Sequence, residues 1–97
     1  MSQPNKERNR QMKIPQCEYD FLTNKIKENE DKIKARYEEI KQQGEFNKSP
    51  EYRLAWDVIY SFYSASVICD LFYSEYGVDD THIGRFGLHC LKNANII

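Results

Sequence analysis

The sequence predicts an all-α fold: a long antiparallel helical hairpin plus a short third helix. Residues 16–43 and 50–76 form two long stretches with helical composition and an apolar spacing of three to four residues. The connection between them is short, and a short connection makes two long helices antiparallel neighbours. No stretch of the sequence has the alternating pattern of a β-strand.

The first helix is expected over residues 16–43. Glu, Lys, Gln and Arg dominate it, and it contains no glycine or proline. Apolar residues recur every seven positions and form one narrow stripe, at Tyr19, Ile26, Ile33 and Ile40. A stripe of this width is typical of a surface helix that packs against a partner helix. Gly44 is the expected end of this helix.

The second helix is expected over residues 50–76. Ser49, Pro50 and Glu51 supply an N-cap residue, a proline at the first helical position and an acid in the first turn. The turn of the hairpin is therefore placed within residues 44–49, and Gly77 is the expected end. From about residue 67 to residue 73 the helix is apolar nearly all round, which predicts that this segment is buried.

A third, shorter helix is expected over residues 80–93, capped by Asp80 or Thr81. Gly84 and Gly87 lie inside it and lower its intrinsic stability. Their missing side chains also allow the helix to approach another backbone closely. We therefore expect close packing of this helix against a neighbour.

The chain of 97 residues is expected to form one helical domain, residues 16–97, preceded by a flexible basic N-terminal arm, residues 1–15. The overall net charge of −1 gives no argument for binding nucleic acid or an anionic membrane. The arm, however, has a local charge of +3, from Lys6, Glu7, Arg8, Arg10 and Lys13. It is predicted to be either a disordered tail or a segment that binds phosphates or an acidic partner.

No pattern in the sequence indicates catalysis. Three cysteines in no framework spacing, with no signal peptide and no apolar run of membrane-spanning length, predict a cytoplasmic protein with reduced thiols. Cys69, His82, His89 and Cys90 lack the spacing of a zinc site. Cys69 is expected to face the core, where a thiol is inert. We therefore expect no metal, no cofactor and no enzymatic activity.

One side of the second helix has no obvious cover from the rest of the chain. On a helical wheel this side carries Trp56, Tyr60, Tyr63 and Val67. Aromatic residues of this kind are enriched in the cores of protein interfaces. Asp70 lies next to Tyr63 on the wheel and is expected either to pair with the third helix or to be exposed in an interface. These five residues are the predicted protein-binding site, unless the third helix and the two tails cover them.

The function that these patterns favour is a small non-enzymatic protein-binding protein, an inhibitor or adaptor. Its partner is expected to be a protein target or a second copy of the chain, as in a homodimer. The small size and the richness in Asn, Lys, Ile, Glu and Tyr resemble phage and mobile-element accessory proteins, which include inhibitors of host defence complexes. The alternative is a small regulatory nucleic-acid-binding protein that uses Lys6, Arg8, Arg10 and Lys13.

Overall fold

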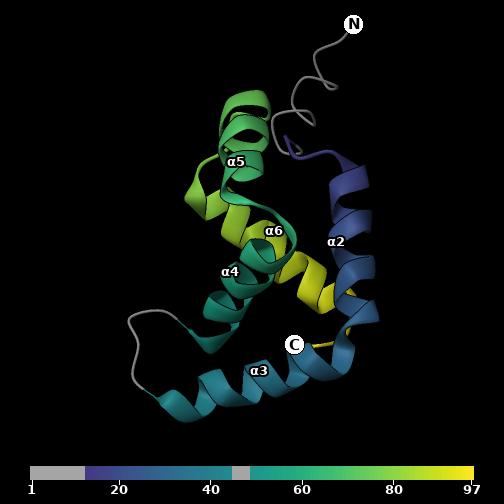
Figure 1. Ribbon diagram of the computed structural model, residues 1–97, viewed down its shortest axis with the longest axis vertical. Helices are drawn as coiled ribbons and strands as arrows, with labels where there is room; N and C mark the ends of the chain where they lie inside the picture. The colour runs from purple at the N-terminus through teal and green to yellow at the C-terminus, as the bar shows by residue number, and fades with distance from the viewer. Residues whose placement is uncertain (1–12, 45–48) are drawn as a thin grey trace, which may run out of the picture.

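The computed structural model describes residues 13–44 and 49–97, and every regular element in these two ranges is helical. The elements are α2 (Gln16–Glu28), α3 (Glu30–Gln43), α4 (Pro50–Phe62), α5 (Ala65–Val67), the π-helix η1 (Ile68–Glu75) and α6 (Asp80–Asn93). The chain is all-α, as the sequence predicts. The predicted architecture of a long hairpin plus one short helix is wrong, because both long helices are broken (Figure 1).

The first break lies at Asn29, where the chain turns sharply from α2 into α3 (Figure 1). Asn29 has φ −118° and ψ 29°, outside the helical region, and its side-chain amide donates to the carbonyl oxygen of Lys25 at 2.9 Å. A polar side chain that bonds to the preceding turn competes with the regular helix and favours such a bend. As a result α3 packs mainly on α4, whereas α2 packs mainly on α6.

The second break lies at Tyr63 and Ser64, which both have extended backbone conformations. The hydroxyl of Ser64 accepts a hydrogen bond from the backbone N–H of Val67 at 3.2 Å and caps a new helix. A serine in this geometry satisfies an N–H group that a helix start leaves without a partner. The predicted helix over residues 50–76 is therefore two separate helical segments.

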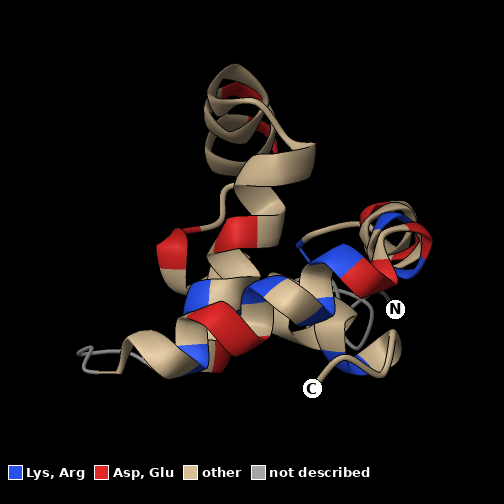
Figure 2. Ribbon diagram, turned by 60° about the horizontal axis from the view of Figure 1, so that its bottom comes forward, with Lys and Arg blue, Asp and Glu red and all other residues tan. Residues whose placement is uncertain are grey.

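The second of these helices begins as α5 and continues directly as η1. At its end, the N–H of Tyr76 donates to the carbonyl oxygen of Leu71 at 2.8 Å, five residues earlier. The prediction that this segment is buried all round is wrong, since Val67 is 37% exposed and Tyr73 is 38% exposed. Figure 2 shows few charged residues on the α5–η1 segment, whereas Lys and Arg are frequent on α2 and α3.

Helix α6 is the centre of the fold and not a cover at one end, because it packs between α2 and α4 (Figure 1). A Cβ atom on Gly87 would lie 2.9 Å from the Cβ of Ala55 and 3.0 Å from the Ala55 carbonyl oxygen. A Cβ atom on Gly84 would lie 2.5 Å from the ring of Tyr52. The close approach predicted from these two glycines is thus confirmed, and α4 is the neighbour.

Aromatic rings occupy the middle of the core, where η1, α4, α2 and α6 meet. Phe72 and Phe86 are both 1% exposed, and their ring centroids lie 5.6 Å apart. Tyr63 packs against Phe72 at 5.1 Å, and Tyr19 packs edge-on against Phe86 at 4.9 Å. Such tilted and edge-to-face pairs are the preferred geometry of aromatic rings. The remaining buried aliphatic residues include Leu22, Ile26, Leu54, Ile59, Ile83 and Leu91.

Helices α4 and α6 each begin with a side-chain N-cap. The Ser49 hydroxyl accepts from the N–H of Tyr52 at 3.1 Å, which is the cap predicted from the sequence. Helix α6 is capped by Asp79, whose carboxylate accepts from the N–H of His82 at 3.0 Å, and not by Asp80 or Thr81. The predicted turn at residues 44–49 lies largely outside the described residues.

Most of the predicted N-terminal arm also lies outside the described residues. The described part begins at Lys13, and Ile14 is already buried in the core. None of the described helices combines the length and the apolar character needed to cross a membrane.

Candidate functional site

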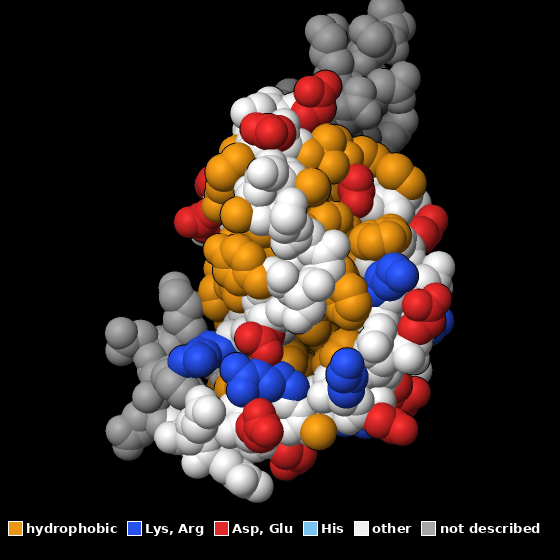
Figure 3. All heavy atoms as spheres, viewed as in Figure 1, with side chains coloured by type: hydrophobic (Ala, Val, Ile, Leu, Met, Phe, Trp, Pro, Cys, Tyr) orange, Lys and Arg blue, Asp and Glu red, His pale blue; other side chains and the backbone are white. Residues whose placement is uncertain are grey.

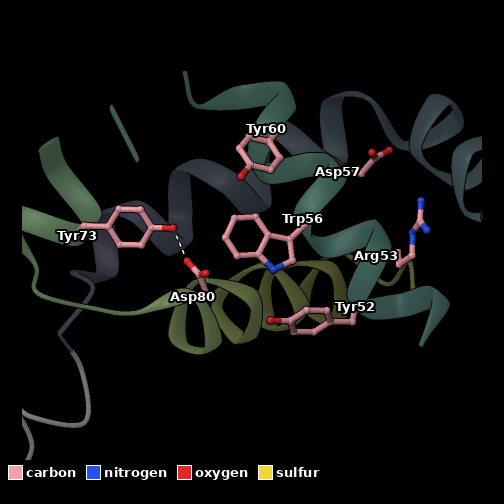
Figure 4. Close-up of a pocket in the computed structure, with 7 residues that line it drawn as sticks. All are labelled: Tyr52, Arg53, Trp56, Asp57, Tyr60, Tyr73 and Asp80. Carbon is pink, nitrogen blue, oxygen red and sulfur yellow. Dashed lines mark hydrogen bonds between the residues drawn. The ribbon is translucent and has the colours of Figure 1, made fainter. Parts of the chain in front are cut away.

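A groove with a volume of about 520 Å³ lies between α4, the π-helix η1 and the start of α6 (Figure 4). We call it the aromatic groove. Its lining residues are Tyr52, Arg53, Trp56, Asp57, Tyr60, Tyr73 and Asp80. Figure 3 shows that hydrophobic side chains gather over α4 and the α5–η1 segment on the face in view, while Lys and Arg lie mainly in its lower half. Exposed apolar surface of this kind on a small protein indicates an interaction site.

One wall of the groove is formed by Trp56 and Tyr60 of α4. Residues four apart lie on the same side of a helix, so their rings are neighbours, with centroids 5.4 Å apart and planes tilted by 33°. Tyr60 is 62% exposed, whereas Trp56 is partly buried against the core. A ring that is fixed on one side and open on the other offers accessible apolar area at little cost in conformational entropy.

The opposite wall is formed by Tyr73 of η1 and Asp80 of α6. The Tyr73 hydroxyl donates a short hydrogen bond to the Asp80 carboxylate (Figure 4). This hydrogen bond, with some burial, raises the pKa of Tyr73 to about 12, so the phenol stays protonated at neutral pH. The bond therefore links η1 to α6 within this wall and holds both side chains at the edge of the groove.

The other end of the groove carries Arg53 and Asp57, on the far side of Trp56 from Asp80 (Figure 4). Asp57 accepts a hydrogen bond from the Nε of Arg36 at 2.6 Å, which ties α3 to α4. Arg36 also pairs with Glu39 at 3.0 Å, and these two carboxylates raise the pKa of its guanidinium. The groove is thus acidic at the Tyr73 end and of mixed charge at the Arg53 end.

The structure does not join the five predicted protein-binding residues into one strip. Trp56 and Tyr60 line the aromatic groove, but Tyr63 is only 6% exposed and packs in the core. Val67 and Asp70 are exposed on the α5–η1 segment and line a separate hollow of about 230 Å³. The cause is the break at Ser64, because a straight helix was the basis of the predicted strip.

Of the residues that line the groove, the predicted site lacks five: Tyr52, Arg53, Asp57, Tyr73 and Asp80. A signal for Tyr52 was present, because it precedes Trp56 by four residues and so shares its side of α4. No sequence signal placed Tyr73 or Asp80, because their positions depend on the π-helix and on where α6 begins.

A polar cluster elsewhere ties the α2 helix to the α5–η1 segment. The carboxylate of Glu18 accepts hydrogen bonds from the hydroxyls of Tyr63 at 2.9 Å and Tyr76 at 2.8 Å. Burial, together with these bonds, raises the pKa of both tyrosines above the ordinary value. The cluster satisfies polar atoms next to the core, which is a structural role.

The side chains considered for thiol or metal chemistry are dispersed. Cys17 and Cys69 are exposed and Cys90 is buried, so the prediction that Cys69 faces the core is wrong. Burial raises the pKa of the Cys90 thiol to about 11. The ring of His82 lies 2.8 Å from the Asp79 carboxylate at the start of α6. In the described residues no three His, Cys, Asp or Glu side chains come together as a metal site.

Of the four cationic residues proposed for nucleic-acid binding, Lys6, Arg8 and Arg10 lie outside the described residues. Lys13 is exposed, and its amino group lies 3.4 Å from the carbonyl oxygen of Gly77.

The fold and the groove define an all-α protein with an exposed aromatic groove. In comparisons with protein-family models, with curated proteins and with solved structures, nothing matched this chain.

Proposed function

We propose that this chain is a small non-enzymatic protein-binding protein, an inhibitor or adaptor, and that it binds its partner through the aromatic groove. The observation that supports this proposal is the pair formed by the half-buried Trp56 and the exposed Tyr60, with Tyr73 on the opposite wall. Trp and Tyr are enriched among the residues that carry most of the energy of protein interfaces. A partner side chain that enters the groove would contact rings from two different elements.

The openness of the groove favours a protein over a small molecule as the occupant. Sites for small ligands bury most of the ligand surface. Here Tyr60 is 62% exposed and Tyr73 is 38% exposed, so the walls enclose little. A protein partner covers such a surface with its own residues, and the charged groups at both ends of the groove then form a polar rim.

The class of partner remains the one favoured by the sequence: a protein target, such as a host complex inhibited by a phage accessory protein, or a second copy of this chain. The three free thiols fit a site of action in a reducing compartment. The alternative function, nucleic-acid binding, depends on the charge of residues 1–15 and has no further support in the described residues.

Site-specific photo-crosslinking in the native host tests the proposal. A photo-reactive phenylalanine analogue replaces Tyr60 in the groove, and a matched control carries it at Glu38, which is exposed on α3. We expect position 60 to give a discrete crosslinked protein, or a crosslinked dimer of this chain, and position 38 to give none. Trp56→Ala, combined with the analogue at position 60, should abolish the crosslink. Equal crosslinking at both positions, or none at position 60, would contradict the proposal.

A further inference from the structure

The two ends of the aromatic groove differ in charge, and this difference restricts what the groove can bind. At one end Tyr73 and the carboxylate of Asp80 face the rings of Trp56 and Tyr60 (Figure 4). At the other end Arg53 lies beside Asp57, whose carboxylate is already paired with Arg36. A cation entering the groove therefore meets a carboxylate at the Tyr73 end and a guanidinium at the Arg53 end.

We infer that the Tyr73 end of the groove binds an arginine side chain of the protein partner, with the guanidinium stacked on the aromatic wall and paired with Asp80. The inference rests on the proposed protein-binding function and adds the chemistry of the residue that is bound. It assigns Trp56 and Tyr60 to the stacking contact and Asp80 to the ion pair.

The aromatic wall formed by Trp56 and Tyr60 favours binding of a cationic side chain. The face of an aromatic ring carries partial negative charge, so a cation within about 6 Å of the ring centre is attracted to it. Trp56 and Tyr60 present two neighbouring rings whose centroids are 5.4 Å apart. A planar guanidinium can stack on such rings and still direct its N–H groups sideways to a carboxylate, which a compact ammonium does less well. Arginine is also enriched in protein interfaces, whereas lysine is depleted.

The position of Asp80 supports the ion pair. Its Oδ1 accepts the hydrogen bond from Tyr73, which orients the carboxylate at the edge of the groove. Asp80 is exposed, so a partner residue can reach it without rearrangement of the fold. A carboxylate held in place in this way loses little conformational entropy when it binds, which favours a specific contact.

The test uses the full chain, and its readout is the indole N–H resonance of Trp56, the only tryptophan in the sequence. The protein is titrated at fixed ionic strength with N-acetyl-arginine methylamide and, separately, with N-acetyl-citrulline methylamide. Citrulline has nearly the same shape but carries a neutral urea group. We expect the arginine amide to bind about two- to fivefold more tightly, and the difference to shrink at high salt. Equal binding of the two amides would overturn the inference.

Variants assign the preference to individual residues. Asp80→Asn should abolish the preference for arginine over citrulline. The matched control Asp70→Asn removes the same charge from the exposed surface of η1, away from the groove, and should leave the preference unchanged. If Asp80→Asn unfolds the protein, Tyr60→Leu replaces it, because the 62% exposed Tyr60 contributes little to the core. A full preference in folded Asp80→Asn or in Tyr60→Leu would also overturn the inference.

These measurements do not depend on knowing the partner, so the two proposals can fail separately. A crosslink from position 60 together with equal binding of arginine and citrulline would leave the protein-binding function in place and overturn the arginine site. A clear arginine preference without a crosslink from position 60 would support the arginine site and contradict the proposed function.

Discussion

At the scale of single residues, Gly87 sets the distance between α6 and α4. Alanine is intrinsically better than glycine inside a helix by about 1 kcal/mol. At position 87, however, the added Cβ would lie 3.0 Å from the carbonyl oxygen of Ala55, a backbone atom that cannot rotate away. Overpacking of a tight contact costs about 1–3 kcal/mol. Gly87→Ala should therefore lower the free energy of unfolding, measured in urea, by about 1–2 kcal/mol.

At Gly84 the obstructing atoms belong to the Tyr52 side chain, which can turn aside, so Gly84→Ala should cost less than Gly87→Ala. Asn24→Ala, on the exposed surface of α2, should raise stability by a few tenths of a kcal/mol through helix propensity alone. Gly87→Ala with stability equal to or above the native chain would show that α6 has room to move.

Ionisation of Tyr63 should make the folding stability decrease at alkaline pH. Burial, with the hydrogen bond to Glu18, raises its pKa in the folded state above the ordinary value of 10.0. Ionisation of this phenol therefore begins at lower pH in the unfolded chain than in the folded one. Its contribution to stability is complete below about pH 10 and is lost as the pH rises from there toward the raised folded pKa.

Chemical unfolding at pH 8 and pH 11 measures this contribution. We expect the native chain to lose more stability between these two pH values than Tyr63→Phe does. Tyr60→Phe, which removes a hydroxyl from an exposed ring, should behave like the native chain. An equal loss in the native chain and in Tyr63→Phe would mean that the buried phenol does not control the alkaline transition.

At the scale of elements, the cap at Ser64 decides where the α5–η1 segment begins and hence where Tyr73 lies. The Ser64 hydroxyl accepts from the N–H of Val67, whereas the Ser61 hydroxyl donates to the carbonyl oxygen of Asp57 within α4. Loss of an N-cap hydroxyl costs about 1 kcal/mol, and loss of a hydroxyl that bonds back within a helix costs close to nothing. Ser64→Ala should therefore lower thermal stability, as Ser49→Ala should at the start of α4, while Ser61→Ala should not. Similar melting temperatures for all three variants would argue against the cap.

The sequence predicts where helices begin better than it predicts where a long helix is broken. The side chains of Ser49 and Asp79 accept from backbone N–H groups three residues further on, so these caps depend on local sequence alone. The sequence therefore predicts the start of α4 at the correct residue and the cap of α6 to within one residue. Asn29 gives no comparable signal, because the seven-residue apolar stripe continues across it from Ile26 to Ile33. The helices that carry these two residues pack on different partners, since α2 packs mainly on α6 and α3 on α4. The bend is therefore decided by tertiary packing.

The candidate site was predicted only in part for the same reason. Trp56 and Tyr60 are neighbours on one regular helix, so their shared side followed from spacing alone. Continuing that spacing predicts Tyr63 and Val67 on the same strip, but the chain leaves the helix at Ser64. The opposite wall depends on a π-helix, which carries no sequence pattern of its own and often occurs at functional sites. The contact between Tyr73 and Asp80 could not be derived without the fold.

At the scale of the whole molecule, truncation of Trp56 should affect partner binding more than folding stability. It is only partly buried, whereas Phe72 is 1% exposed at the centre of the core. Phe72→Ala should cost about 3–5 kcal/mol of folding stability, and Trp56→Ala clearly less. In contrast, truncation of an interface anchor typically costs about 2 kcal/mol or more in binding. Thermal melting and sedimentation of both variants compare the two effects, and a loss of stability at Trp56 as large as that at Phe72 would place Trp56 in the core.

Removal of the N-terminal residues distinguishes the two functions that the whole chain could perform. Deletion of residues 1–12 removes three cations and one anion and shifts the net charge from −1 to −3. The described core begins at Ile14, so the deletion should leave the melting temperature within a few degrees of the native value. If the aromatic groove is the binding site, partner crosslinking from position 60 should also persist after the deletion.

If the chain instead binds nucleic acid through the arm, binding should fall sharply and lose its dependence on salt, because phosphate contacts weaken steeply as salt increases. Fluorescence anisotropy with a labelled duplex at two salt concentrations decides this. Salt-dependent duplex binding by the native chain that disappears on deletion would favour the arm over the groove.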